Sequence, residues 1–214
     1  MDIYKYKLLI SNLPVKAQSF STKRKTWEKA ENKNEWLKKY NNNLFNHEES
    51  ISISRMDVFD TIDIKELIIK TIYWGYSNGM RGNNFIHILE NIDKLVVIFR
   101  NLKNKPKLYT DDFIIFVKKI KGVKGIGLST YSKILYFLRI KFDNSNCFIL
   151  DKRLIDVFAN STYREFSQLS KINYNNAQNY YLNYMQLMEI LANRLETKGE
   201  NIEQFLFIFG DNLK

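Results

Sequence analysis

Cysteine, histidine, proline and glycine are all scarce in this chain, and each scarcity excludes a class of protein. A single cysteine, Cys147, cannot form an internal disulfide, nor supply the four thiolates of an iron–sulfur cluster or a cysteine zinc site. The two histidines, His47 and His87, lie far apart in the sequence, which argues against a histidine metal site or a histidine-relay hydrolase. Only 2 prolines and 8 glycines occur in 214 residues, which excludes collagen-like and proline-rich classes and permits long helices.

Long apolar runs are missing as well. No stretch approaches the roughly 20 apolar residues that a membrane span needs. The first residues, Met1 to Lys5, contain no apolar core of a signal peptide. We therefore expect a soluble, reduced, cytoplasmic protein with no membrane partner.

Acidic residues are outnumbered, with 33 lysines and arginines against 23 aspartates and glutamates and a formal net charge of +10. Such an excess suits a polyanionic partner. The lysine-rich codon usage of an AT-rich genome explains it equally well, so charge alone does not decide. Aromatic residues make up 14% of the chain, enough apolar surface for a packed core rather than disorder.

Apolar residues recur at steps of three and four along much of the chain, which is the helical period. The pattern predicts helices over residues 61–73, 83–100, 109–120, 177–196 and 200–209. Asp60 or Thr61 is the expected cap of the first of these. Alternation typical of a strand is limited to Ile51–Ser54, which has no evident partner, and segments 41–46 and 142–146 read as loops. The fold class expected is all-α, with roughly eight helices.

Residues 120–139 combine two helical patterns with a glycine-rich loop between them, which contains Gly122, Gly125 and Gly127. Glycines allow the backbone to turn tightly and to approach a ligand closely. Amide groups at the start of the second helix favour an anion. For a basic protein, a DNA phosphate is the natural anion.

This hairpin resembles that of the helix-hairpin-helix superfamily of DNA glycosylases, which reads approximately Leu-Pro-Gly-Val-Gly-x-x-Thr-Ala. Residues 123–131 read Val-Lys-Gly-Ile-Gly-Leu-Ser-Thr-Tyr, so Lys124 replaces the proline and Tyr131 the small residue. The family also carries an aspartate after apolar residues beyond the second helix, and here Phe148-Ile149-Leu150-Asp151 matches it. Over residues 60–160 the chain is most similar to compact prokaryotic oxoguanine-glycosylase-like proteins, a group that includes anti-phage DNA glycosylases.

The resemblance implies that Asp151 is catalytic. An anion beside C1′ stabilises the positive charge that develops on the sugar, and it orients or deprotonates a water. The alternative is an ordinary helix cap. Members that also cleave the strand carry a lysine two residues after the last hairpin glycine, where this chain has Ser129. That resembles the monofunctional pattern. Lys133 lies one turn later and is the alternative nucleophile, although we expect it to be exposed or to face a phosphate.

The resemblance also implies further contacts with duplex DNA. The residues expected to bind it are Gly125, Gly127, Ser129, Thr130, Lys124 and Arg153 around the hairpin, and Asn78, Arg81 and Asn83 in an upstream loop. The residues expected to stack on an extruded base are Trp74, Tyr76 and Phe148. The backbone carbonyls of Lys121, Val123 and Ile126 would hold a structural Na⁺ or K⁺, and no other cofactor is expected.

The glycosylase fold implies two helical lobes with a cleft, formed by residues 55–142 with the hairpin at 120–139, and by residues 1–54 plus 143–214. The function expected is that of a monomeric DNA glycosylase, which flips a damaged or modified base and hydrolyses its N-glycosidic bond in repair or anti-phage defence. One alternative is a bifunctional glycosylase and lyase that uses Lys133. The other is a DNA-binding module without enzymatic activity. The base remains open between an oxidised purine and a hypermodified phage base.

Overall fold

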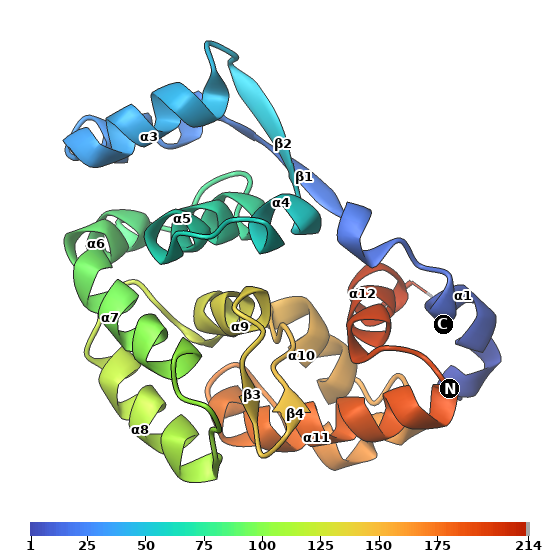
Figure 1. The fold of residues 1–214 in the computed structure, drawn as a ribbon. Coiled ribbons are helices and arrows are strands. Elements are labelled where there is room, and N and C mark those ends of the chain that lie inside the picture. The colour runs from blue at the N-terminus through green and yellow to red at the C-terminus, as the bar shows by residue number, and fades with distance from the viewer. Residues whose placement is uncertain (213–214) are drawn as a thin grey trace. The chain divides into compact units, whose positions relative to one another are not determined.

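A computed structural model describes residues 1–212, and helices dominate it (Figure 1). Helix accounts for 62% of the structure and strand for 7%, which confirms the all-α fold class. The segments 109–120, 177–196 and 200–209 are helical, as the apolar period predicts, and their observed ends lie within one residue of the predicted ones. Among the described residues, no helix has the length and apolar character needed to cross a lipid bilayer.

The chain divides into two compact units. Unit 1 consists of Met1–Val15, Pro106–Phe113 and Leu128–Lys214, and unit 2 consists of Lys16–Lys105 and Ile114–Gly127. The lobes expected from the sequence are divided differently: residues 16–54 belong to unit 2, and residues 106–113 and 128–142 belong to unit 1. Residues 213 and 214, at the end of the expected second lobe, lie outside the described part of the chain.

Unit 2 contains a two-stranded ribbon and most of the N-terminal helices. Its elements are β1 (Ser19–Lys23), α2 (Glu28–Glu31), α3 (Glu35–Phe45), β2 (Ser50–Ser54), α4 (Arg55–Phe59), α5 (Ile64–Gly75), α6 (Asn84–Glu90), α7 (Ile92–Lys103) and most of α8 (Thr110–Lys121). Helix α5 packs against α7 and against the ribbon. The core includes Trp27 stacked on Tyr73, with ring centroids 4.2 Å apart, and Phe85 edge-on to Trp27 at 4.8 Å.

The ribbon corrects the expectation that Ile51–Ser54 lacks a partner. Strands β1 and β2 pair antiparallel, with Phe20 opposite Ile53. The sequence Ser-Phe-Ser-Thr-Lys of β1 carries little apolar alternation, so it gave no strand signal. Its buried position is Thr22, whose hydroxyl donates to the Ser77 carbonyl at 2.8 Å and accepts from Trp27 Nε1 at 3.0 Å. Tertiary hydrogen bonds therefore stabilise this strand where propensity is weak.

The loop expected at residues 41–46 is also wrong, because α3 continues to Phe45 and only Asn46 adopts a left-handed conformation that ends the helix. Asn41 is fully buried in this helix. Its Nδ2 donates to Glu31 at 2.9 Å, and its Oδ1 accepts from the Tyr73 hydroxyl at 2.9 Å. These contacts override the low helix propensity of asparagine.

Two further helix boundaries differ from the sequence pattern. The apolar run over 83–100 forms two helices, α6 and α7, separated at Asn91, whose Nδ2 donates to the His87 carbonyl. Helix α5 begins after Asp63, whose carboxylate accepts from the Glu66 amide, and neither Asp60 nor Thr61 caps it. Apolar periodicity continues across both breaks, so it could not reveal them.

Unit 1 contains the C-terminal helices. Its elements are α1 (Lys7–Ser11), the start of α8, α9 (Leu128–Phe137), β3 (Lys141–Phe142), β4 (Ser145–Asn146), α10 (Lys152–Ala159), α11 (Ala177–Leu195) and α12 (Gly199–Phe209). The long helix α11 packs against α12 and β4 (Figure 1). The loop expected at 142–146 is partly wrong, because β3 and β4 pair antiparallel within it and only Asp143 and Asn144, both at positive φ, form the turn between them. The core here includes Phe113 stacked on Tyr181, with ring centroids 5.5 Å apart.

Candidate active site

Asp151 caps the N-terminus of α10, where its backbone is extended, with φ −115° and ψ −179°. Its Oδ1 accepts hydrogen bonds from the amides of Arg153 at 3.1 Å and Leu154 at 3.3 Å. The other carboxylate oxygen is not used by these bonds. Since the side chain is 16% exposed, the carboxylate is held at the positive end of a helix while part of it stays accessible.

Lys133 of α9 lies beside this carboxylate. Its Nζ is 3.8 Å from Asp151 Oδ2, and it donates to Ser129 Oγ at 2.9 Å and to the Ser129 carbonyl at 3.1 Å. The residue is only 4% exposed, so the expectation of an exposed lysine is wrong, while the alternative that it faces a phosphate stays a prediction. Side chains on a helix lean toward its N-terminus. The Lys133 side chain therefore runs back over one turn and brings its amine to Ser129.

The arrangement joins three groups that the sequence analysis singled out separately. A buried lysine is rare unless a charge partner and hydrogen bonds compensate its desolvation. Here Asp151 supplies the charge, and the hydroxyl and carbonyl of Ser129 supply the bonds. Chemically, an amine can act as a nucleophile and a capped carboxylate can stabilise positive charge, so this arrangement can support covalent displacement at a sugar carbon.

The hairpin loop separates α8 from α9, and two of its glycines, Gly125 and Gly127, have different surroundings. Gly125 has φ +87°, and a Cβ added there would lie 2.3 Å from the carbonyl oxygen of Asn84. Gly125 is therefore required by backbone conformation and by packing against α6. A Cβ on Gly127 would meet nothing within 4 Å, so this position is open to a ligand.

Of the other residues expected at the hairpin, Thr130 is only 2% exposed, so its side chain points into the protein. Lys121 and Lys124 are exposed, as a phosphate contact requires. Arg153 is exposed but held, since its NH1 donates to the Phe207 carbonyl at 3.2 Å and its guanidinium lies 4.6 Å from the centre of the Phe207 ring.

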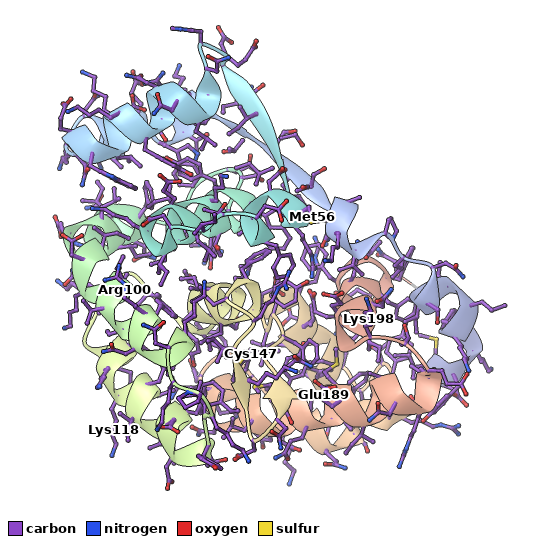
Figure 2. All side chains as sticks on the ribbon, viewed as in Figure 1. Met56, Arg100, Lys118, Cys147, Glu189 and Lys198 are labelled. Carbon is purple, nitrogen blue, oxygen red and sulfur yellow. The ribbon has the colours of Figure 1, made fainter. Side chains whose placement is uncertain are left out.

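The upstream loop between α5 and α6 contains Asn78, Arg81 and Asn83, all of them exposed. Asn83 Oδ1 accepts a hydrogen bond from Lys29 Nζ at 3.1 Å. Their exposure is compatible with the expected contact with DNA, which stays a prediction. The basic residues Arg100 of α7 and Lys118 of α8, in the same unit, are labelled in Figure 2.

The three aromatic residues expected to stack on a base are distributed over both units. Trp74 is 4% exposed, donates from Nε1 to the Gln18 carbonyl at 3.2 Å, and has the Arg55 guanidinium 5.2 Å from its ring centre. Tyr76, nearby in the same unit, is half-buried. Phe148 belongs to unit 1, where its ring lies against Gly199 so closely that an added Cβ would be 2.3 Å away. Packing in the protein core is sufficient to explain the buried positions of the Trp74 and Phe148 rings.

No group of three or more histidine, cysteine, aspartate or glutamate side chains in the described residues could hold a metal ion. Burial raises the pKa of the Cys147 thiol far above its usual range, so this residue is an unreactive part of the core. The carbonyl site expected at Lys121, Val123 and Ile126 is of a different kind and stays a prediction.

A model of the family described as "Putative 8-oxoguanine DNA glycosylase OGG-like protein" matches residues 13–207, a span that includes the hairpin, Lys133 and Asp151. The chain belongs to this family. Membership implies a DNA glycosylase whose substrate is DNA, and it confirms the resemblance to oxoguanine-glycosylase-like proteins. No curated protein and no solved structure gives a match.

Proposed function

We propose that this OGG-like glycosylase excises a base with Lys133 as the nucleophile and then cleaves the abasic strand. The observation that carries the proposal is the position of the Lys133 amine, 3.8 Å from the Asp151 carboxylate and 2.9 Å from Ser129 Oγ. The monofunctional expectation depended on the serine at position 129. The amine of Lys133 reaches that serine from the next turn, so the geometry favours the bifunctional alternative.

The first step is displacement of the base from an extruded nucleotide. The neutral amine of Lys133 forms a bond to C1′, while the C1′–N bond breaks and the base leaves with its electron pair. The proton that the Lys133 ammonium gives up passes to the base, which leaves as a neutral molecule, so Asp151 stays ionised. Positive charge that develops on the sugar is stabilised by the ionised Asp151, which is worth several kcal/mol in a preorganised site.

The second step opens the strand. The sugar ring opens to an imine between Lys133 and C1′, which acidifies the proton on C2′. Removal of that proton expels the 3′ phosphate by β-elimination. Water then hydrolyses the imine, which returns the free amine and releases the unsaturated aldehyde end. No external oxidant or metal is needed in this sequence.

DNA binding is assigned to the hairpin loop and the lysines beside it. The open side of Gly127 and the exposed Lys121 and Lys124 suit a phosphate. Lys121 ends α8, so its carbonyl and that of Val123 lie beyond the regular hydrogen bonding of the helix. Together with Ile126 they offer the neutral oxygen ligands that suit Na⁺ or K⁺, which would add positive charge beside the phosphate.

The base is proposed to be an oxidised purine, which the family's description favours. Duplex destabilised by damage lowers the cost of flipping, which is a few kcal/mol for a paired base. A hypermodified phage base, and with it a role in defence, is the alternative outcome. Mass spectrometry of the bases released from oxidised DNA and from several phage genomes distinguishes these two.

The experiment that tests the nucleophile is borohydride trapping on DNA with a preformed abasic site. Wild-type protein should form a covalent complex, and Lys133→Ala should form none. If Lys133→Ala traps as well as wild type, the lysine is not the nucleophile. If wild type releases base without trapping, Asp151 activates water instead and the enzyme is monofunctional. If wild type binds DNA but does neither, only the DNA-binding module remains.

A further inference from the structure

The chain between β4 and Asp151 is an extended segment, Cys147–Leu150, that belongs to neither a helix nor a strand. All four of its side chains are at most 4% exposed (Cys147 is labelled in Figure 2). Backbone polar groups in such a place need partners, because leaving one unsatisfied costs about 1–3 kcal/mol. This segment obtains several of them from side-chain hydroxyls.

Two tyrosines of α11, one turn apart, bind consecutive carbonyls of the segment. The Tyr181 hydroxyl donates to the Phe148 carbonyl at 2.9 Å, and the Tyr184 hydroxyl donates to the Ile149 carbonyl at 2.8 Å. Both tyrosines are fully buried. A buried phenol with a short bond to a rigid partner has little freedom, so each bond fixes the position of one peptide unit.

A serine of α9 binds the next residue. Leu150 N donates to Ser132 Oγ at 3.2 Å, and Ser132 is fully buried. Ser132 immediately precedes Lys133, and Leu150 immediately precedes Asp151. The Ser132–Leu150 contact and the Lys133–Asp151 contact therefore connect the same two pieces of backbone at adjacent residues.

We infer that Ser132, Tyr181 and Tyr184 are positioning residues, which together set the distance between the Lys133 amine and the Asp151 carboxylate. This inference rests on the proposed function, and it names residues that touch neither substrate nor the reacting atoms. Displacement at C1′ requires the amine and the carboxylate at fixed places, and an error of about 1 Å can reduce a rate by about 100-fold. The three hydroxyls bind one backbone group on each of the last three residues before Asp151.

At its other end, near Cys147, the segment is held by contacts that involve no side-chain hydroxyl. Cys147 N donates to the Ile140 carbonyl at 2.9 Å, and Asn146 N donates to Glu189 at 2.9 Å. The Phe148 ring packs against Gly199. These contacts hold the segment in the unit without the hydroxyls. Loss of one hydroxyl should therefore shift the end near Asp151 rather than unfold the segment.

The test uses Tyr184→Phe and Ser132→Ala in the full chain, since each removes one oxygen and little else. The matched control is Tyr180→Phe on the same helix, where the tyrosine is half-buried. We expect single-turnover base release to fall between about tenfold and 100-fold in both test variants. Affinity for abasic duplex should stay within twofold of wild type, and the control should match wild type in both measurements.

Rate and affinity measured together separate positioning from stability. A displaced carboxylate slows base release but leaves the DNA-binding surface intact, so the rate should fall while DNA affinity and the folded fraction, measured by denaturant unfolding, stay near wild type. A smaller folded fraction instead lowers base release and the amount of bound DNA in proportion. Ser132→Thr, which keeps the hydroxyl, should recover most of the rate if it folds, and Tyr184→Phe alone decides the question if it does not.

Base release within twofold of wild type in both variants, or a loss of rate matched by an equal loss of folded protein, would overturn the inference while leaving the proposed function intact. A wild-type protein that neither releases a base nor traps abasic DNA would overturn both. The two failures are therefore distinguishable in the same set of measurements.

Discussion

The Lys133–Asp151 pair and the hairpin loop at residues 122–127 are built on opposite principles. The pair is enclosed, and its geometry depends on hydrogen bonds from distant parts of unit 1. The loop is largely exposed, and its geometry depends on one glycine at positive φ, Gly125, which packs against the Asn84 carbonyl. In the function proposed above, the pair carries the chemistry and the loop binds DNA. Substitutions should affect one without the other.

The largest difference between the effect on base release and the effect on DNA affinity is expected for Asp151→Asn. The amide oxygen of asparagine can still accept from the Arg153 and Leu154 amides, so the cap survives. The negative charge is lost, and base release should fall about 100-fold or more, the scale for losing a preorganised catalytic charge. DNA affinity should stay equal or rise slightly, because one anion near phosphates is removed. Base release and duplex binding are measured side by side.

Asp156→Asn is the matched control on the same helix, since Asp156 forms only an exposed ion pair with Lys152. Such a pair contributes about 0–1 kcal/mol, so activity should not change. Equal base release by Asp151→Asn and Asp156→Asn would show that Asp151 is only a cap.

The two hairpin glycines should respond differently to valine. Gly125→Val forces a branched residue into φ +87° against the Asn84 carbonyl, and it should destabilise the fold by roughly 1–3 kcal/mol. Gly127→Val meets no protein atom, so the melting temperature should stay near wild type while affinity falls for every DNA sequence alike. Thermal unfolding and binding to two unrelated duplexes measure this. Unchanged affinity in a folded Gly127→Val protein would remove the loop from the DNA interface.

Added salt should weaken DNA binding through the hairpin loop but should change the reaction rate at the Lys133–Asp151 pair little. DNA affinity should decrease with a log–log slope of about −0.9 per phosphate neutralised, because lysines at the hairpin release counterions. Lys124→Gln should reduce that slope by about one unit. The rate of the bound complex should change little, since the enclosed pair is poorly screened. An affinity that does not respond to salt would contradict the nucleic-acid assignment of the loop.

The smallest effect on base release and DNA binding is expected for the ion pair of Glu31 and Arg24 in unit 2, which takes part in neither. Glu31 is desolvated by burial, which raises its pKa, but hydrogen bonds from Arg24 and Asn41 outweigh this and lower the pKa below its usual value. Its contribution to stability is therefore present above the unfolded pKa and is lost as pH falls through the folded one. Glu31→Gln should flatten the acidic side of the stability–pH curve, measured by denaturant unfolding, without affecting base release.

Local patterns in the sequence predicted α8, α9, α11 and α12 and the glycine loop of the hairpin, because each depends on neighbouring residues. The position of Lys133 was not predictable in the same way. Spacing puts it on the face of Ser129, but only the packed structure shows that its side chain is buried and turned back toward the N-terminus. The role proposed for Ser132 depends on a contact across 18 residues, for which the chain carries no local signal.

Long-range contacts also explain why the expectations for β1 and for the end of α3 in unit 2 were wrong. Strand β1 and the end of α3 are stabilised by Thr22 and Asn41, which bind residues elsewhere in the unit. A polar residue used in this way looks like a loop residue in sequence. One signal was available for the active site, since tyrosines 181 and 184 occur one turn apart in an otherwise apolar helix face and needed hydrogen-bond partners.

The central claim is that the Lys133 amine, which lies beside Ser129, is the nucleophile that attacks C1′. Its most direct test is borohydride trapping on abasic duplex with wild type, Lys133→Ala and the exchange variant Ser129→Lys/Lys133→Ser. We predict a covalent complex with wild type, none with Lys133→Ala, and recovery of trapping to within about 100-fold of wild type in the exchange variant, because the amine returns to the same site from one turn earlier. Trapping by Lys133→Ala, or none by wild type, would contradict the claim.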